Sequence, residues 1–359
     1  MKICFLVGTL GQGGAERQLY YYLQALKECN VETYVLSATI GEYWEEKIAA
    51  IGVPVKWVGR HPGFINRLFA IYREIKKNPV DIIYSQHFHM NLYAFLVARM
   101  LKVKDVGSLR NNVYSEIETV PVVGRFCLYF PKYLVANSKA AVENAVILGR
   151  KPCNLFYLPN YVDYQFYQPV VRKSRENIIV SFVGTIKRQK RVDRIIRLAK
   201  KCLDDRRKIQ FRIYGDGYGD RSHLEEMKRL AIHLGVLGNN LEFMGRVLDP
   251  LVAYHESDIF LLTSDYEGTP NVVLEAMACG LPIVSTNVGD LPNIIEPQFN
   301  GFLVDREDEE GLYNSLLMLY ENPSLRERMG FQNRQKITSQ RSIKRLSRDL
   351  IDLFNTICG

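Results

Sequence analysis

The sequence lacks the cysteine and metal-ligand patterns that hold many small proteins together. Its seven cysteines are scattered among 359 residues, odd in number and never spaced as Cys-x2-Cys, so neither a disulfide framework nor a zinc site is predicted. No uninterrupted apolar stretch approaches the ~20 residues of a membrane-spanning helix. No Asp-x-Asp stands at a predicted strand end, so we expect that no metal or other cofactor is required. These absences favour a protein of the reducing cytoplasm.

Charge is uneven along a chain of ordinary globular composition, with 47% hydrophobic and 24% charged residues. A chain of 359 residues can form two domains, each with its own core. Within the net charge of +8, residues 1–165 hold 19 Lys and Arg against 13 Asp and Glu, and residues 326–359 hold 8 against 3. The basic residues lack interleaved aromatic side chains on a recognisable module, so nucleic acid is not an expected partner.

Strand-like and helix-like segments alternate through the first half of the chain. Residues 1–8 are interpreted as a buried strand, because the apolar run is too short for a signal peptide and no small-residue cleavage site follows. Further strands are predicted at 33–37, 55–58, 82–85, 106–109 and 133–136, and helices at 64–77, 90–101 and 138–148. This alternation predicts a parallel sheet covered by helices.

The stretch from Asp265 to Thr286 is the most informative part of the sequence. Two apolar runs, 259–262 and 282–285, predict buried parallel strands on either side of a helix. Thr269 can cap this helix, Pro270 suits its first position, and Gly280 can take the left-handed conformation after its end. The N–H groups of the first turn would then face the carboxyl edge of the sheet, where they suit phosphate or sugar oxygens.

Two acids flank the start of this helix, Glu267 before it and Glu275 in its second turn. Ionised carboxylates accept hydrogen bonds, so one can bind a hexose hydroxyl and the other a ribose diol. As isolated acids they would instead be interpreted as a charge favoured by the helix dipole and a solvated helix face.

The string Glu-Gly-Thr-Pro-Asn-Val-Val-Leu-Glu-Ala-Met-Ala-Cys-Gly-Leu-Pro-Ile-Val, from residue 267, resembles the Glu-x7-Glu signature of the family-four retaining glycosyltransferases. The resemblance implies an α/β GT-B fold, with two Rossmann-like domains whose parallel sheets face each other across a cleft. It implies an acceptor-side domain at 1–165, a nucleotide-sugar-binding domain at 166–335 and a closing helix at 336–359 that packs back on the first domain. Leu158-Pro159-Asn160-Tyr161-Val162-Asp163 resembles the interdomain Pro-Asn-Gly-Val-Asp, with Tyr161 in place of glycine.

The resemblance also implies a donor site. Glu267 would orient the donor sugar, Glu275 would bind the ribose, and Lys190 would grip the diphosphate. Two further turns resemble the family's pattern, the glycine-rich Gly8–Gly14 segment and Phe243-Met244-Gly245-Arg246-Val247. The remaining implied donor-binding residues are Gly13, Gly14, Gly268, Thr269, Pro270, Asn271, Val272, Arg246 and Val247.

One departure from the family pattern affects the diphosphate grip. Thr185 and Arg191 stand where the family usually has arginine and glycine. Threonine cannot replace a bidentate arginine. We therefore expect Arg188 or Arg191 to compensate, and the sequence leaves open which of the two does so.

On the acceptor side, the resemblance and the strand ends indicate three residues. His89 follows the strand 82–85 and matches a histidine in the family's Phe-His-x-Asn-Leu. Arg110 and Asn111 follow the strand 106–109, where many relatives have a histidine, and Arg110 is a candidate for binding an anionic acceptor group. A lone histidine, however, is more often structural than catalytic.

The segment 64–77 has apolar residues at helical spacing beside Arg67, Arg73, Lys76 and Lys77. The simpler interpretation is a core-packed helix with a solvated face. The alternative is a basic amphipathic helix on an anionic membrane, with the protein peripheral on the inner face of the cell membrane.

The resemblance implies retaining transfer of a hexosyl group from a nucleotide-diphosphate-sugar to a saccharide or lipid-linked saccharide, in cell-surface polysaccharide or lipopolysaccharide biosynthesis. The leaving diphosphate would itself take the acceptor proton, so catalysis would depend on positioning and charge stabilisation. Two alternatives stay open: a nucleotide-sugar epimerase of the same fold, and a non-catalytic, membrane-associated nucleotide-sugar-binding protein. Fold does not decide the sugar, the nucleotide, the acceptor or the oligomeric state.

Overall fold

The computed structural model describes residues 1–60, 63–171, 175–247 and 249–359. The chain divides into two compact units. Unit 1 comprises Met1–Tyr161 and Ile343–Gly359, and unit 2 comprises Val162–Ser342. The boundaries between the units, after residues 161 and 342, therefore lie a few residues away from the expected boundaries after 165 and 335.

Unit 1 is built on a seven-stranded parallel sheet with the order β3-β2-β1-β4-β5-β6-β7. The central strands of this sheet are almost entirely buried, as expected for a parallel sheet with helices on both faces, whereas the edge strands β3 and β7 are partly exposed. Its strands are β1 (Lys2–Val7), β2 (Glu32–Ser37), β3 (Val55–Trp57), β4 (Ile82–Ser85), β5 (Lys104–Leu109), β6 (Tyr133–Ala136) and β7 (Leu155–Tyr157).

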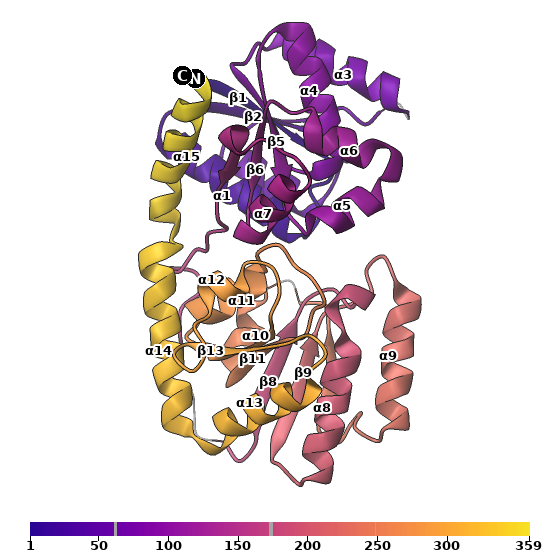
Figure 1. Cartoon of the computed structure of the whole chain (residues 1–359), viewed down its shortest axis with the longest axis vertical. Coiled ribbons are helices and arrows are strands. Elements are labelled where there is room, and N and C mark those ends of the chain that lie inside the picture. The colour runs from indigo at the N-terminus through magenta and orange to yellow at the C-terminus, as the bar shows by residue number, and fades with distance from the viewer. Residues whose placement is uncertain (61–62, 172–174, 248) are drawn as a thin grey trace. The chain divides into compact units, whose positions relative to one another are not determined.

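Helices cover both faces of this sheet, as Figure 1 shows for the indigo-to-magenta part of the chain. The closing helix α15 packs on α1 within unit 1, and both contribute to the same apolar core. The helices of unit 1 are α1 (Gly14–Glu28), α2 (Tyr43–Ala50), α3 (Phe64–Lys77), η1 (Phe88–Met90), α4 (Asn91–Leu101), α5 (Val113–Thr119), α6 (Pro121–Tyr129), α7 (Lys139–Ile147), η2 (Pro152–Asn154) and α15 (Ile343–Cys358).

Unit 2 repeats this plan with six parallel strands in the order β10-β9-β8-β11-β12-β13. The strands are β8 (Ile178–Val183), β9 (Ile209–Tyr214), β10 (Leu241–Gly245), β11 (Ile259–Leu262), β12 (Ile283–Thr286) and β13 (Gly301–Val304). The helices are η3 (Arg188–Lys190), α8 (Val192–Asp204), α9 (Arg221–His233), α10 (Leu251–Glu256), α11 (Asn271–Ala278), α12 (Leu291–Ile294), α13 (Glu309–Glu321) and α14 (Pro323–Gln340). The prediction of two Rossmann-like α/β units is confirmed.

Local capping signals were accurate with one exception. The Ser138 side chain accepts a hydrogen bond from Ala141 N at the start of α7, and Gly280 ends α11 with φ +70°. The start of α11 was predicted one residue too early: Pro270 is the cap, with an extended ψ of 112°, and Asn271 is the first helical residue. Thr269 lies buried in the preceding loop. No helix in the described part of the chain is long and apolar enough to cross a membrane.

Tyr161 stands where the family has glycine, and it packs the end of the segment Met1–Tyr161 against the rest of unit 1. Its side chain is buried in the core that α1 and α15 share, and its hydroxyl donates to Asp349 of α15. Its backbone N–H and carbonyl pair with both ends of the Gln18 amide, over 3.0 and 2.7 Å. The segment expected to be a linker is therefore well packed at this point.

Candidate functional site

Each sheet has a topological switch point, where neighbouring strands are followed by crossovers on opposite sides. In unit 2 this point lies between β8 and β11, and in unit 1 between β1 and β4. Ligands of open α/β sheets bind outside the carboxyl ends of the strands at such points. The loops that follow these four strands are therefore the candidate ligand-binding positions.

In unit 2 the two loops bring Lys190 and Glu267 together. Lys190 Nζ lies 2.5 Å from Glu267 Oε1, and the same oxygen accepts a hydrogen bond of 2.7 Å from Ser264 Oγ. The two side chains are only 18% and 10% exposed. The loops are also joined through Gln189, whose carbonyl accepts from Asp265 N and whose amide donates to Tyr266 O. The ion pair is thus held at the switch point by both backbone and side-chain contacts.

Arg191 has a left-handed backbone, with φ +48°, at the position where the family usually has glycine. That conformation is costly for a residue with a side chain, so Arg191 must be held by its contacts. Its Nε donates to Asp193 over 3.0 Å and its Nη1 to Asp265 over 3.2 Å. Hydrogen bonding to Asp193 raises the pKa of Arg191 above its ordinary value.

The Arg188 side chain is 75% exposed, and its guanidinium lies 3.4 Å from Glu226 on α9. In this structure Lys190 contacts Glu267, whereas Arg188 and Arg191 contact other acids. That Arg188 or Arg191 compensates for the missing family arginine stays a prediction.

Glu275 lies inside α11 and is 1% exposed. Tyr254 of α10 donates a hydrogen bond of 2.7 Å to Glu275 Oε2. The Tyr254 ring is itself fully buried and packs edge-on against Phe260 and Tyr167. Glu275 is therefore not a solvated helix charge, which was the simpler interpretation of the sequence. A buried carboxylate oriented by a rigid tyrosine can recognise a ligand hydroxyl with little loss of entropy.

The loop before α11 is shaped by a close backbone contact. Asp290 N donates to Gly268 O over 2.9 Å, and a Cβ on Gly289 would lie only 2.0 Å from that oxygen. The turn after β12 thus packs against the turn after β11. The residues predicted to face the donor, Gly268, Thr269, Pro270, Asn271 and Val272, occupy this loop and the first positions of α11.

Three glycines lie at the ends of successive strands on the other side of the switch point. A Cβ on Gly215 would lie 1.9 Å from Gly184 O, and Gly215 N donates to Gly245 O over 2.8 Å. A side chain is therefore excluded at Gly215, at the carboxyl end of β9. Arg246 and Val247 follow Gly245, and Arg246 Nη1 is 3.9 Å from Asp216. This edge allows a flat ligand group to approach the backbone.

In unit 1 the loop after β1 is joined to the loop after β4 by His87. The His87 Nδ1 accepts a hydrogen bond of 3.1 Å from Gly8 N, so its Nε2 carries the proton and donates to Glu16 over 3.1 Å. Gly13 caps α1, and a Cβ there would lie 2.2 Å from Glu16 Oε2. His87 thus positions the glycine-rich loop and the first turn of α1, which begins at Gly14.

The three predicted acceptor-side residues are dispersed around this edge. The His89 ring stacks on His87 at 5.7 Å between centroids, and it lies so close to Gly8 that a Cβ there would be 2.2 Å from Nε2. Asn111 accepts a hydrogen bond from Asn112 N.

Arg110 points inward. Its guanidinium donates to Tyr22 OH and Tyr84 OH over 2.9 and 3.2 Å. It also donates to Gln86 Oε1 over 3.2 Å, and it stacks on the Tyr22 ring. These core contacts occupy most of the donors that an anionic ligand would need.

Sequence reasoning assigned no role to Glu16, Ser264 or Tyr254, and it considered His87 only with His89, as a histidine after the strand 82–85 that is more often structural than catalytic. Ser264 could have been found from its position directly before the Glu267 loop, because it follows the apolar strand. Glu16, His87 and Tyr254 depend on contacts across distant segments. In the described residues no group of three or more His, Cys, Asp or Glu side chains could hold a metal ion. The expectation that no metal is required stays a prediction.

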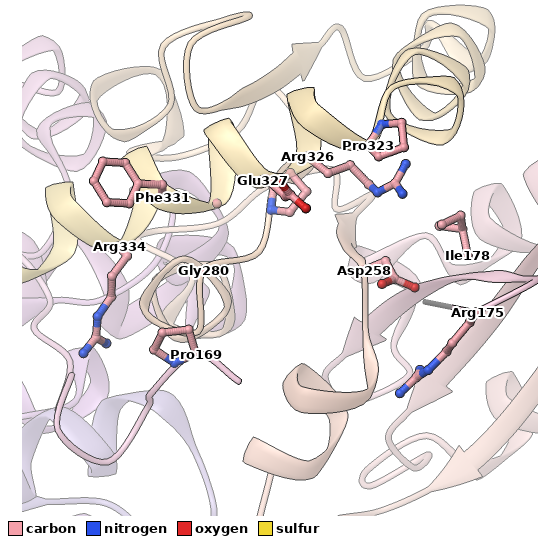
Figure 2. Close-up of a pocket in the computed structure, with 12 residues that line it drawn as sticks. Pro169, Arg175, Ile178, Asp258, Gly280, Pro323, Arg326, Glu327, Phe331 and Arg334 are labelled. Carbon is pink, nitrogen blue, oxygen red and sulfur yellow. The ribbon is translucent and has the colours of Figure 1, made fainter. Parts of the chain in front are cut away.

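A cavity of about 600 Å³ lies at the opposite edge of the unit 2 sheet, where Ile178, Asp258 and Pro282 stand at the amino ends of β8, β11 and β12. Figure 2 shows α14 along one side of it, with Arg334 pointing toward Pro169 and Arg326 toward Pro323. Arg326 donates to the carbonyl of Tyr320, and Arg334 to that of Ala278. These arginines satisfy carbonyls at the ends of α13 and α11. They have structural roles, and the switch point stays the candidate site.

Comparison with known families accounts for nearly the whole chain. A family described as Glycosyltransferase Family 4 matches residues 12–166. A second, described as Glycosyl transferases group 1, matches residues 163–336. The two matches adjoin at the boundary between the units.

Relatives and solved structures agree with these matches. The chain is 24% identical to the capsular polysaccharide biosynthesis glycosyltransferase CapM of Staphylococcus aureus, over 73% of this chain and 72% of CapM. It is 22% identical to an Escherichia coli UDP-Gal:alpha-D-GlcNAc-diphosphoundecaprenol alpha-1,3-galactosyltransferase, over 80% and 79%. The fold resembles Anabaena HepE, crystallised with UDP-glucose, with a TM-score of 0.89 at 18% identity over 99% of this chain and 100% of HepE.

Proposed function

The chain belongs to the group 1, family-four glycosyltransferases. On that premise we propose that it transfers a hexosyl group, with retention, from a nucleotide-diphosphate-sugar to a saccharide or lipid-linked saccharide. The proposed pathway is the synthesis of cell-surface polysaccharide or lipopolysaccharide. CapM and the E. coli galactosyltransferase support this assignment by their own named activities. UDP is the nucleotide we favour, because HepE was crystallised with UDP-glucose.

The observation that carries the proposal is the arrangement of Lys190, Glu267 and Glu275 in unit 2. Lys190 and Glu267 form an ion pair at the switch point, and Glu275 is buried behind the same loop with one oxygen held by Tyr254. A donor diphosphate offers Lys190 a stronger partner than Glu267. Its binding frees the Glu267 carboxylate to accept hydrogen bonds from the sugar hydroxyls.

The proposed chemistry requires no carboxylate nucleophile. The bond from the sugar to the diphosphate breaks while the acceptor oxygen attacks from the same face, and the leaving diphosphate takes the acceptor proton. Charge that develops on the diphosphate is stabilised by Lys190 and by the N–H groups at the start of α11. Positioned groups of this kind typically contribute 10²- to 10³-fold to turnover.

The test combines binding and turnover. Purified protein is heated with a panel of nucleotide-sugars, and release of nucleotide diphosphate is measured with and without acceptors. Stabilisation by one donor, reduced in a Glu275→Gln variant, and accompanied by nucleotide-diphosphate release, would support the proposal. The anomeric configuration of the product, read by NMR, tests retention. Binding of a donor without release in any acceptor-containing membrane extract would instead favour a non-catalytic protein.

We also propose that unit 1 contacts an anionic membrane surface through α3. Ile65, Phe69 and Lys76 share one helix face, at spacings of four and eleven residues, and all three are exposed. Unit 1 contains 22 Lys and Arg against 14 Asp and Glu, whereas unit 2 contains 25 of each. The whole net charge of +8 therefore belongs to the unit that contains α3. Apolar side chains beside cations are suited to the surface of an anionic bilayer.

Co-sedimentation tests this surface directly. The wild type should pellet with vesicles that contain anionic phospholipid and stay in solution with phosphatidylcholine alone. Ile65→Glu should reduce the bound fraction. Ile232→Glu, an equally exposed apolar position on α9 of unit 2, is the matched control and should have no effect. Equal binding to both kinds of vesicle would contradict the proposal.

A further inference from the structure

Asp290 is a fully buried acid that packs against the loop before α11 in unit 2. It directly precedes α12, and its N–H donates to Gly268 O over 2.9 Å. Its side chain makes no capping hydrogen bond to the backbone of α12, all of which is described. The carboxylate instead accepts from the Asn293 amide over 3.2 Å and from Arg341 Nη2 over 3.4 Å. Helix capping therefore does not explain why this buried position has a charge.

Arg341 reaches Asp290 from the C-terminal end of α14. It is the residue that ends this helix, 51 residues further along the chain, and its side chain is only 11% exposed. Its backbone is held on both sides, because its N–H donates to Ile337 O and its carbonyl accepts from Val162 N, each over 2.9 Å. The guanidinium thus extends from a fixed backbone toward the acid, and all of these residues belong to unit 2.

Stability alone is a weak explanation for a pair buried to this extent. The cost of removing two charges from water offsets much of their attraction, so apolar side chains of similar volume often stabilise a protein equally well. In some proteins such pairs instead fix one arrangement of the groups around them. Here the adjacent group is the turn Glu267–Gly268. A Cβ on Gly289 would lie 2.0 Å from Gly268 O and 2.8 Å from Glu267 O, so the turn before Asp290 packs directly on both carbonyls.

We propose that Arg341 is a positioning residue of the donor site. By holding Asp290 it fixes the Gly268 carbonyl, and with it the neighbouring Glu267 carboxylate that orients the donor sugar. This inference rests on the proposed transferase function, and Arg341 acts through Asp290 rather than by contact with a substrate. A misplacement of about 1 Å at a reacting site can cost about 10²-fold in turnover. The sugar part of the donor should therefore be more sensitive to Arg341 than the nucleotide part.

The experiment separates these two parts of the donor in Arg341→Met. Calorimetry measures the Kd of UDP and of UDP-glucose, UDP-galactose and UDP-GlcNAc, and the slow release of UDP is followed in water without an acceptor. Arg341→Met should bind UDP as the wild type does. Its affinity for the UDP-sugar that the wild type binds should fall about 3- to 10-fold, as for loss of hydrogen bonds to Glu267. Release of UDP should slow about 10- to 100-fold.

Three further variants distinguish positioning from a general structural role. Arg341→Met combined with Asp290→Asn keeps the N–H at position 290 and leaves no charge to compensate, so it should recover most of the loss. Arg341→Lys keeps the charge on a shorter side chain and should lose less than Arg341→Met; it also supplies the comparison if methionine prevents folding. Arg345→Met is the matched control, because Arg345 Nε also lies 3.4 Å from an acid, Asp349, but its side chain is 54% exposed. It should behave as the wild type.

Three outcomes would overturn the inference. The first is an Arg341→Met variant with wild-type affinity for the UDP-sugar and wild-type release of UDP. The second is a parallel weakening of UDP and UDP-sugar binding, which would mean that Arg341 supports unit 2 as a whole. The third is a double variant as impaired as Arg341→Met, because Arg341 would then not act through Asp290. A wild type that binds neither UDP nor any of the UDP-sugars would instead refute the proposed use of a UDP-sugar donor.

Discussion

Replacing Lys190 by methionine should weaken both the fold of unit 2 and its catalysis. Methionine keeps much of the side-chain length and removes the charge. Among the described residues, only the Ser264 hydroxyl then still donates a hydrogen bond to Glu267, whose side chain is 10% exposed. Breaking a buried ion pair by removing one partner costs about 3–5 kcal/mol, and an exposed pair contributes about 0–1 kcal/mol. For this mostly buried pair we expect a loss of about 2–4 kcal/mol.

A thermal unfolding series checks this magnitude. For a unit of this size, 1 kcal/mol corresponds to a change of about 2–4 °C, so Lys190→Met should lower the melting temperature by about 4–16 °C. The double variant Lys190→Met, Glu267→Gln should be more stable than the sum of the single variants predicts, because it leaves no unpaired charge. Turnover of the donor by Lys190→Met should fall about 10²- to 10³-fold, as for the loss of one positioned group that stabilises the transition state.

Lys187→Met supplies the matched control, because Lys187 belongs to the same loop and is exposed. It should change neither the melting temperature nor turnover. The reasoning is refuted if Lys190→Met melts and turns over like the wild type, or if the single and double variants are strictly additive. A loss of stability without loss of turnover would limit Lys190 to a structural role.

Three further predictions follow from individual contacts. Tyr254→Phe removes the hydroxyl that orients Glu275, so UDP should bind about 3- to 10-fold more weakly by calorimetry; 2′,3′-dideoxy-UDP should bind both forms equally, and a weakening for both ligands would exclude a ribose contact. Gly8→Ala places a Cβ 2.2 Å from His89 Nε2 and should cost about 1–3 kcal/mol in urea unfolding; adding His89→Ala should restore most of it, and no restoration would contradict the clash. Because burial raises the pKa of Glu116 to about 7 from 4.5, the folded state binds the proton more tightly, and stability from this group declines as pH rises from about 4.5 to 7. Glu116→Gln should therefore gain stability relative to the wild type over that range, by about 2–3 kcal/mol at pH 8. Parallel stability curves for the two proteins would contradict the burial of Glu116.

The sequence predicted the features that depend on local chemistry. Apolar runs such as 259–262 became buried strands, and Gly280 ended α11 in the left-handed conformation. The same local logic placed the Glu267 loop after a strand. The predicted start of α11 was wrong by one residue, because both Thr269 and Pro270 are compatible with the cap position. Only the packing of the loop selects Pro270.

The side-chain partnerships in the two units were decided by the tertiary structure. The family resemblance implies that Lys190 and Glu267 belong to one site, but their contact depends on β8 and β11 being neighbours in the sheet. Arg110 follows a strand end, as expected of a ligand-binding residue, yet its guanidinium turns inward because Tyr22 and Tyr84 offer it hydroxyl partners in the core.

The contrast has one physical cause. Helix ends, turns and buried strands are set by residues within a few positions of each other, so the sequence by itself determined the α/β class, the parallel sheets and the location of the Glu267 to Glu275 loop. The partners of His87, Tyr161 and Glu275 lie 71, 143 and 21 residues away. Such distances along the chain carry no signal about contact, because only the completed packing of strands and helices brings those atoms within hydrogen-bonding range.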